Sequence, residues 1–384
     1  MLNFLLVIFI FSFSLCVLTY IVYPLSIWFI GNITCIDLQH GDIEPSVSII
    51  ISAFNEEKDI KQKIKNTIAL DYATDKREIL IGSDGSTDNT IEIAKKYAGQ
   101  GIKLFNFATN RGKTSVQNDL VQEASGEVLI FTDSASFLPK DALKKLVRNF
   151  ADPRVGCVAG KMSFIETNQN ITTQSQGLYW RYEMNIREME SRLGSLIGVD
   201  GPLYAVRRDC YIPLQSNIIS DLMTPLLVLE QGKKVILEPE ALVEEKPTQK
   251  GRHELNTRRR ITLRGLVGIF SHPEVISPLK HPLLTLQIFS HKVIRWFVGP
   301  LTALNFISCS AILYYDIFFF RLIFSLYVMF FAAAGIGWLC EQSGKKIKLL
   351  TIPYYFCLVN LAATLGIIDF FMKKQAVTWK TVRN

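Results

Sequence analysis

Residues 128–136 read Val128-Leu129-Ile130-Phe131-Thr132-Asp133-Ser134-Ala135-Ser136, an apolar run that ends at a single carboxylate. Four consecutive large apolar residues are typical of a strand that is buried on both faces. In an open α/β sheet, ligands bind just outside the carboxyl ends of the strands, which makes Asp133 a candidate site residue. The alternative is that Asp133 only caps the helix expected near Pro139.

Three earlier segments repeat this pattern of a strand that ends in polar residues. Strands are expected at 47–53, 77–81 and 102–107, each followed by a helix, at about 55–70, 87–97 and 113–124. Asn55 is placed to cap the first helix, and Thr87 or Asp88 the second. Strands and helices that alternate at short spacing predict a parallel sheet with right-handed crossovers. The predicted fold class is therefore α/β, with a Rossmann-like, mostly parallel sheet.

The loops after these strands carry charged side chains to one edge of the sheet. Carboxylates follow the first, second and fourth strands, and Arg111 and Lys113 follow the third. Acidic loops with a lysine suit a phosphorylated ligand and a divalent cation. The sequence has neither the Gly-x-x-x-x-Gly-Lys-Ser/Thr loop of P-loop NTPases nor the Gly-x-Gly-x-x-Gly of dinucleotide enzymes. Four convergent loops favour a binding site at this edge over a helix cap at Asp133.

The second half of this domain has the same kinds of element. Strands are expected at 155–159, 203–206 and 234–237, with helices at 141–150, 171–193 and from Ser220 onward. The helix at 171–193 has an apolar stripe that we expect to be core: Leu178, Tyr182, Ile186, Met189 and Leu193.

Hydrophobic residues make up 49% of the 384-residue chain, and their excess lies in long uncharged segments. Membrane spans are expected at 4–30, 291–314, 319–339 and 352–372, since each is long enough for a ~30 Å hydrocarbon core. The first is expected to be an anchor and not a cleaved signal peptide, because no Lys or Arg precedes Lys58. The alternative is that one of the four lies in the membrane interface, which leaves the number of crossings open. The expected order is an anchor (1–31), the α/β domain (46–250), interfacial amphipathic helices (251–290), transmembrane helices (291–372) and a basic tail (373–384).

Basic residues cluster near the expected membrane segments. A helix at 254–270 carries Arg258, Arg259, Arg260 and Arg264, and we expect it to lie on the membrane with these arginines toward lipid phosphates. The alternative is a solvated helix face. The formal charge of +7 indicates attraction to a membrane surface and not nucleic-acid binding. Seven scattered cysteines and five histidines form no zinc or disulfide pattern, which suits a reducing cytosolic face.

The ordered set of motifs resembles the membrane-bound family 2 glycosyltransferases, the group that includes cellulose, hyaluronan and poly-N-acetylglucosamine synthases. The resemblance runs in order through about residues 46–265. It is carried by Ala53-Phe54-Asn55-Glu56-Glu57, Ser83-Asp84-Gly85-Ser86-Thr87-Asp88, Arg111-Gly112-Lys113 with Asn118, Phe131-Thr132-Asp133, Gly198 to Arg208, Ser220-Asp221, and Glu238-Pro239-Glu240-Ala241 with Glu244.

The resemblance implies a GT-A fold, cytosolic and flanked by transmembrane helices of the plasma or inner membrane, that binds a UDP-linked sugar. By position, Asn55, Glu56 and Asp84 would hold the nucleoside, Lys113 the nucleotide or its phosphates, and Asp133 a bridging Mg²⁺ or Mn²⁺. Asp221 matches the general base of such enzymes; the alternative is that it only caps the helix beginning at Ser220. Arg258, Arg259 and Arg260 would contact the diphosphate. A single displacement at the anomeric carbon would invert it.

The chain departs from the family pattern in two places. The family usually has Asp-x-Asp where this chain has Asp133-Ser134-Ala135, so one carboxylate is missing. The Gln-x-x-Arg-Trp motif of the polymerising synthases is replaced by Arg258-Arg259-Arg260-Ile261. The expected function is extension of a polysaccharide or glycan. The alternatives are transfer of one sugar to a lipid-linked acceptor or, in a different class, an inactive sugar-nucleotide-binding scaffold of a synthase complex.

Overall fold

A seven-stranded sheet in the order β3-β2-β1-β4-β6-β5-β7 forms the centre of the α/β domain. The computed structural model describes residues 1–164, 171–245, 250–344 and 347–378. Among the strands of the described residues, only β6 runs antiparallel to its neighbours, so the sheet is mixed and mostly parallel, as the sequence predicts. The strands are β1 (Val47–Ala53), β2 (Arg77–Asp84), β3 (Ile102–Phe107), β4 (Val128–Asp133), β5 (Val155–Phe164), β6 (Leu203–Arg207) and β7 (Lys234–Glu245).

Both faces of the sheet are buried, which explains the continuous apolar runs in its strands. Ile49 and Ile51 pack with one set of helices and Ile50 with the other, because successive side chains of a strand point to opposite faces. Helices α3 (Ile60–Ile68), α4 (Thr90–Lys95) and α6 (Ala142–Val147) contribute to the first layer. Helices α5 (Lys113–Gln122), α7 (Ile171–Arg192) and α8 (Ser220–Glu230) contribute to the second.

The structure corrects several expected boundaries. Asn55 does not cap a helix: it adopts a left-handed conformation with φ of 53°, and α3 begins only at Ile60. β5 and β7 continue well beyond Ala159 and Leu237 because they pair with each other across a register shift at Gly160/Lys161. The sequence did not show this extension, since the added residues include exposed, charged side chains.

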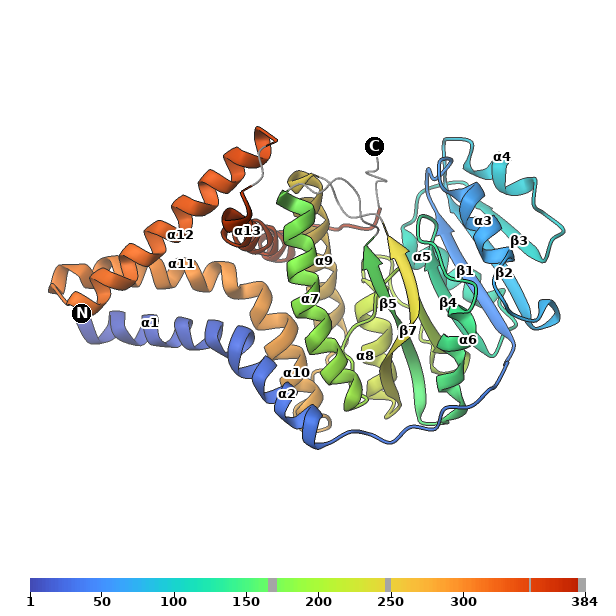
Figure 1. Ribbon diagram of the computed structural model, residues 1–384, viewed down its shortest axis with the longest axis horizontal. Coiled ribbons are helices and arrows are strands. Elements are labelled where there is room, and N and C mark those ends of the chain that lie inside the picture. The colour runs from blue at the N-terminus through green and yellow to red at the C-terminus, as the bar shows by residue number, and fades with distance from the viewer. Residues whose placement is uncertain (165–170, 246–249, 345–346, 379–384) are drawn as a thin grey trace.

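Four segments are long and apolar enough to cross a membrane: Leu2–Ile33, Pro282–Tyr315, Phe318–Gln342 and Lys348–Phe371. They contain α1 (Leu2–Val17) and α2 (Tyr23–Ile33), α10 (Pro282–Ile288) and α11 (Ile294–Ile312), α12 (Phe318–Gln342), and α13 (Thr351–Phe371). In Figure 1, α1, α11 and α12 extend together away from the α/β domain. The expected apolar stripe of α7 is buried in part against the anchor, where Tyr182, Met189 and Leu193 pack on Tyr23 and Ile27.

Helix α13 differs from the other three segments in its position. It packs along α9 (Gly251–Ser271) and is seen nearly end-on in Figure 1, across the direction of α1, α11 and α12. Near its beginning, Tyr355 donates a hydrogen bond to Glu254 of α9 (2.7 Å), and near its end Asp369 pairs with Arg259. Both ends of α13 therefore lie beside the α/β domain.

The arginines of α9 contact protein groups, contrary to the expected contact with lipid phosphates. Arg264 is buried and donates to the Thr114 hydroxyl (2.8 Å) and the Ile218 carbonyl (2.5 Å). Arg258 donates to Glu254 (2.8 Å), and Arg259 pairs with Asp369. The basic side of α9 thus joins the α/β domain to α13.

Candidate functional site

The loops after β1 and β2 are joined by hydrogen bonds. The Thr87 amide donates to the Asn55 side-chain oxygen (2.8 Å), and the Asn55 amide donates to the Ser86 hydroxyl (3.1 Å). The Glu56 amide donates to the Thr90 hydroxyl (2.8 Å). The left-handed conformation of Asn55 permits these contacts, since Asn tolerates this backbone region better than most residues. These bonds hold Asn55 and Glu56 at the carboxyl edge of the sheet.

Asp84 orders the loop that follows β3. Its two oxygens accept hydrogen bonds from the amides of Arg111 (2.7 Å) and Gly112 (2.8 Å). Burial raises the pKa of the Asp84 carboxyl, while the two amides and the Arg111 guanidinium oppose this. Asp84 has no exposed surface, so its position lends no support to the predicted contact with a nucleoside.

Lys113, Asp133 and Asp221 converge at Gly201. Lys113 Nζ donates a hydrogen bond to Asp133 Oδ1. A Cβ placed on Gly201 would lie 3.2 Å from Asp221 Oδ2, 3.3 Å from Lys113 Nζ and 3.7 Å from Asp133 Oδ2. Two carboxylates and an ammonium from three separate elements thus surround Gly201, where a Cβ would be in tight contact with two of them.

Asp221 lies in the first turn of α8, next to this group. The Val199 amide donates to its backbone oxygen (2.9 Å), and its carboxylate oxygen Oδ2 faces Gly201. Burial raises the pKa of the Asp221 carboxyl; Lys113 and Arg264 oppose this, and Asp133 and Asp200 add to it. A raised carboxyl pKa is the kind of tuning found in carboxylates that exchange protons in catalysis.

A buried lysine supports the strand end that carries Asp133. Lys63 of α3 is fully buried and donates to the Thr132 hydroxyl and the Ser136 carbonyl, both at 2.7 Å. Burial lowers its pKa to about 7, against the opposing effect of Asp133. Lys63 thereby fixes the segment in which this chain lacks the second carboxylate of Asp-x-Asp.

The three consecutive arginines of α9 have different surroundings. Arg260 lies near the Asp221 and Asp133 carboxylates, which oppose the lowering of its pKa by burial. Arg258 lines a cavity beside Asp221. Arg259 is engaged with Asp369 of α13, so its position lends no support to the predicted contact with a diphosphate.

The segment after α13 returns to the carboxyl edge of the sheet. Gly112, with φ of +90°, is so close to this segment that a Cβ there would lie 2.3 Å from the Val377 carbonyl oxygen. From the sequence, residues 373–384 are expected to be only a basic tail. In the structure the part of this tail up to residue 378 lies beside the α/β domain, where Val377 approaches Gly112. Residues 379–384 lie outside the described part of the chain.

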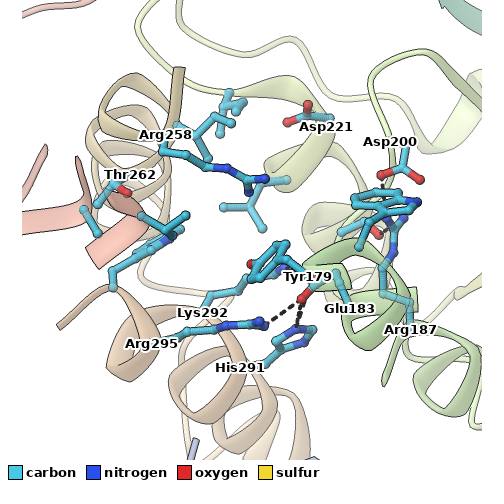
Figure 2. A pocket seen from close by; sticks show the side chains of 18 of the residues that line it. Tyr179, Glu183, Arg187, Asp200, Asp221, Arg258, Thr262, His291, Lys292 and Arg295 are labelled. Atoms are coloured by element: carbon cyan, nitrogen blue, oxygen red, sulfur yellow. Dashed lines mark hydrogen bonds and ion pairs between the residues drawn. The ribbon is translucent and has the colours of Figure 1, made fainter. Parts of the chain in front are cut away.

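A cavity of about 210 Å³ lies between the α/β domain and the membrane helices (Figure 2). We call it the junction cavity. Asp221 and Asp200 lie on one side of it in Figure 2, and Arg258 of α9 points toward its centre. Glu183 of α7 accepts hydrogen bonds from Lys292 (3.1 Å) and Arg295 (2.6 Å) of the α10–α11 segment. Its charged residues on α7 and α11 were not recognised in the sequence, because the two helices are more than a hundred residues apart.

The described residues offer a divalent cation one carboxylate, that of Asp133, and no complete set of protein ligands. They contain no group of three His, Cys, Asp or Glu side chains arranged to hold a metal ion. Asp133 Oδ2 faces Gly201, whereas Asp133 Oδ1 is engaged with Lys113. Mg²⁺ is commonly held by one or two carboxylates together with substrate phosphates and water. The chain therefore fits a cation that a diphosphate ligand shares with Asp133.

Comparison with known proteins agrees with this arrangement. Residues 48–212 match the family described as Glycosyl transferase family 2. An N-acetylglucosaminyltransferase of Rhizobium sp. (strain N33) is 27% identical over 224 residues, which is 54% of this chain and 49% of that protein. A poly-beta-1,6-N-acetyl-D-glucosamine synthase of Staphylococcus aureus (strain COL) is 31% identical over 126 residues, which is 32% of this chain and 30% of that protein. The chain thus spans half or less of the length of these curated relatives.

One solved structure resembles nearly the whole chain. A mannosyltransferase from Pyrobaculum calidifontis, in complex with GDP-Man and Mn²⁺, has a TM-score of 0.73 and 19% identity. The match covers 96% of this chain and 100% of that one. At this identity the likeness shows the fold alone. Residues 48–212 form a glycosyl transferase family 2 domain with a GT-A fold, which confirms the predicted family and fold.

Proposed function

We propose that the chain is an inverting membrane glycosyltransferase that moves a sugar from a UDP-linked donor to a polysaccharide or glycan acceptor. The observation that carries the proposal is the convergence of Lys113, Asp133 and Asp221 at Gly201. The named relatives favour N-acetylglucosamine as the sugar. The α/β domain would lie on the cytosolic side of the membrane, where nucleotide sugars are available.

The groups at the sheet edge divide the chemistry between donor and acceptor. Asn55 and Glu56 would bind the nucleoside, and Lys113 with Arg260 would neutralise the diphosphate. A Mg²⁺ or Mn²⁺ held by Asp133 would supply further charge neutralisation to the leaving group. Asp221 would accept the proton of the acceptor hydroxyl while the hydroxyl oxygen forms a bond to the anomeric carbon of the donor sugar. The bond from that carbon to the diphosphate oxygen breaks, and UDP leaves with the electron pair.

The runner-up is transfer of a single sugar to a lipid-linked acceptor. It is favoured by the place of the junction cavity, which Tyr20 and Asn360 of the membrane helices line together with Asp221. Product length separates the two: a ladder of products supports polymerisation, and one discrete product supports single transfer.

The proposal is tested with the full chain in detergent and a panel of UDP-N-acetylglucosamine, UDP-glucose and GDP-mannose, with and without Mn²⁺. Asp221→Asn should bind UDP as the wild type does but lose transfer by about 10²–10⁴-fold, the range of general-base contributions. Asp75→Asn, at an exposed position, is the matched control. Undiminished transfer by Asp221→Asn would refute the assignment of the base. A wild type that binds UDP-sugars without turning any of them over would favour the inactive scaffold.

A further inference from the structure

The segment that leads into Asp221 is irregular. Residues 211–219 form neither a helix nor a strand, and Ser220 and Asp221 are the first two residues of α8. The backbone groups of an irregular segment need hydrogen-bond partners from other parts of the structure. The position of the proposed base therefore depends on the groups that bind the residues just before it.

One side of this segment is bound by α5. The Thr114 hydroxyl donates to the Ile218 carbonyl (2.8 Å), and the Asn118 side-chain amide donates to the Leu214 carbonyl (2.7 Å). Thr114 and Asn118 are four residues apart and so lie on the same face of the helix. Because α5 begins at Lys113, these bonds join the segment before Asp221 to the helix that carries the lysine.

The segment is also bound by a single side chain of α9. Arg264 Nη2 donates to the carbonyls of Ile218 (2.5 Å) and Ser216 (3.1 Å), and to the Thr114 hydroxyl (2.8 Å). The Ile218 carbonyl thus accepts hydrogen bonds from both Arg264 and Thr114, since a carbonyl oxygen has two lone pairs. Arg264 therefore connects α9 to the start of α5 and to a carbonyl three residues before Asp221.

Two glycines bring α9 close to the first turn of α8. A Cβ at Gly268 would lie 2.6 Å from the Met223 side chain, and a Cβ at Gly265 would lie 3.3 Å from the Leu222 side chain. This close packing keeps Arg264, the neighbour of Gly265, against the segment before α8.

Arg264 is a buried cation whose acceptors, among the described residues, are all neutral oxygen atoms. Burial lowers the pKa of its guanidinium to about 10; Arg260 adds to this and Asp221 opposes it, so Arg264 is charged at neutral pH. Burying a charge without a paired counter-charge costs free energy. This arrangement favours a functional role over a purely stabilising one.

We propose that Arg264 is a positioning residue of the proposed reaction, which holds the segment before α8, and with it the carboxylate of Asp221, against the groups at Gly201. Its charge also favours the unprotonated form of that carboxylate. Since α9 packs along α13, the placement of the base then depends on a helix outside the sheet and its covering layers. This inference rests on the proposed glycosyltransferase function and concerns the same site.

The test compares Arg264→Gln and Arg264→Lys with the wild type, as full chains in detergent. The donor is whichever of UDP-N-acetylglucosamine, UDP-glucose and GDP-mannose the wild type turns over fastest. Arg264→Gln should lower kcat about tenfold and leave the Kd for UDP unchanged, because a misplaced base slows the chemical step. Arg264→Lys keeps the charge and should recover part of the loss. Arg252→Gln, at an exposed position of α9, is the matched control.

The pH profile separates this role from a purely structural one. Arg264 lowers the pKa of the Asp221 carboxyl, and a base must be unprotonated to accept a proton. In Arg264→Gln the acid limb of kcat/KM should therefore move to higher pH, whereas in Arg264→Lys it should stay. Thr114→Val removes a hydroxyl and no charge, so it should lower kcat without moving the limb. The charged and titratable groups near Asp221 are Lys113, Arg260, Arg264, Asp133, Asp200 and Tyr204.

The possible outcomes separate this inference from the proposed function. A folded Arg264→Gln with the kcat and the acid limb of an active wild type would overturn the inference alone. Equal losses in Arg264→Gln and Arg264→Lys with an unmoved limb would also overturn it, since the role would then be structural. If Arg264→Gln does not fold in thermal-unfolding measurements, wild-type kcat in both Arg264→Lys and Thr114→Val would overturn it. A wild type that turns over no donor would overturn the proposed function, and this inference with it.

Discussion

The ammonium of Lys113 lies against the carboxylate of Asp133. The lysine therefore binds one oxygen of the residue that is predicted to hold the metal ion. Lys113 begins α5 and Asp133 ends β4, and both side chains are largely buried. A divalent cation at Asp133 must therefore compete with Lys113, unless a diphosphate draws the lysine away.

Removing this competitor should change metal and nucleotide binding in opposite directions. In Lys113→Gln, we expect Mn²⁺ without nucleotide to bind about tenfold more tightly and UDP to bind about tenfold more weakly. Isothermal titration with each ligand measures both effects. Lys103→Gln, which removes a half-exposed lysine of β3 that pairs with Glu78 of β2, should change neither. Unchanged affinity for Mn²⁺ in Lys113→Gln would show that the ion pair does not control the metal site.

The pH dependence of transfer should report on Asp221. Its pKa is raised by burial, and a base must be unprotonated to accept a proton. As pH falls through this pKa, kcat/KM should therefore fall, at a pH above the ~3.9 of an ordinary aspartate. Lys113 lowers the pKa of Asp221, so Lys113→Gln should move this acid limb to higher pH. A limb at the same pH in wild type and variant would contradict the coupling.

A methyl group at position 201 should block the site without unfolding the protein. The Cβ of Gly201→Ala would lie within 3.2–3.3 Å of Asp221 Oδ2 and Lys113 Nζ, so these groups must shift. A misplacement of reacting groups by about 1 Å can cost on the order of 10²-fold, so transfer should fall by up to that factor. Gly177→Ala in α7, where a Cβ meets no atom within 4 Å, should keep full activity. Equal activity in the two variants would show that the chemistry lies elsewhere.

Helix α13 should leave both of its ends on the side of the α/β domain. Its contacts with Glu254 and Arg259 of α9, and that of Val377 with Gly112, require this arrangement. We expect Lys348→Cys and Lys374→Cys, in a cysteine-free background, to react with an impermeant thiol reagent from the same side of the membrane. Tyr314→Cys, at the end of α11, should react from the opposite side. Lys348→Cys and Lys374→Cys reacting from opposite sides would mean that α13 crosses the membrane.

The order of the elements could be predicted because it depends on local pattern. The run of β-branched residues in β1 and the apolar run of β4 predict strands without knowledge of their neighbours in the sheet. The positions of the loops after these strands follow from the strand ends. Asp84, Lys113 and Asp133 were singled out in this way, since the carboxyl ends of parallel strands meet at one edge, whereas Asp221 was singled out by the family resemblance.

Long-range partners could not be predicted. The arginines of α9 look like a membrane-facing side, but Arg259 pairs with Asp369 and Arg264 bonds Thr114, each more than a hundred residues away. Asn55 has a typical capping sequence, yet its bonds to the β2–α4 loop favour a left-handed backbone instead. The junction cavity is lined by residues of five helices, α7, α8, α9, α11 and α13, which no single segment of the sequence shows.

The π-helical turn Leu18–Val22, which joins α1 to α2, has a consequence for the spacing of this chain. A π-turn holds one more residue than an α-helical turn, so removing one residue from Leu18–Val22 would let α1 continue into α2 without a break. Everything beyond the deletion would keep its orientation about the helix axis, because a π-turn and an α-helical turn each complete one revolution. Removing one residue from the regular part of α1 would instead rotate the residues beyond it by about 100°. The anchor could then not keep both the contacts of α1 with α11 and the hydrogen bond that Tyr23 donates to Glu190 (2.5 Å). The loss of one residue should therefore be tolerated better in Leu18–Val22 than in α1.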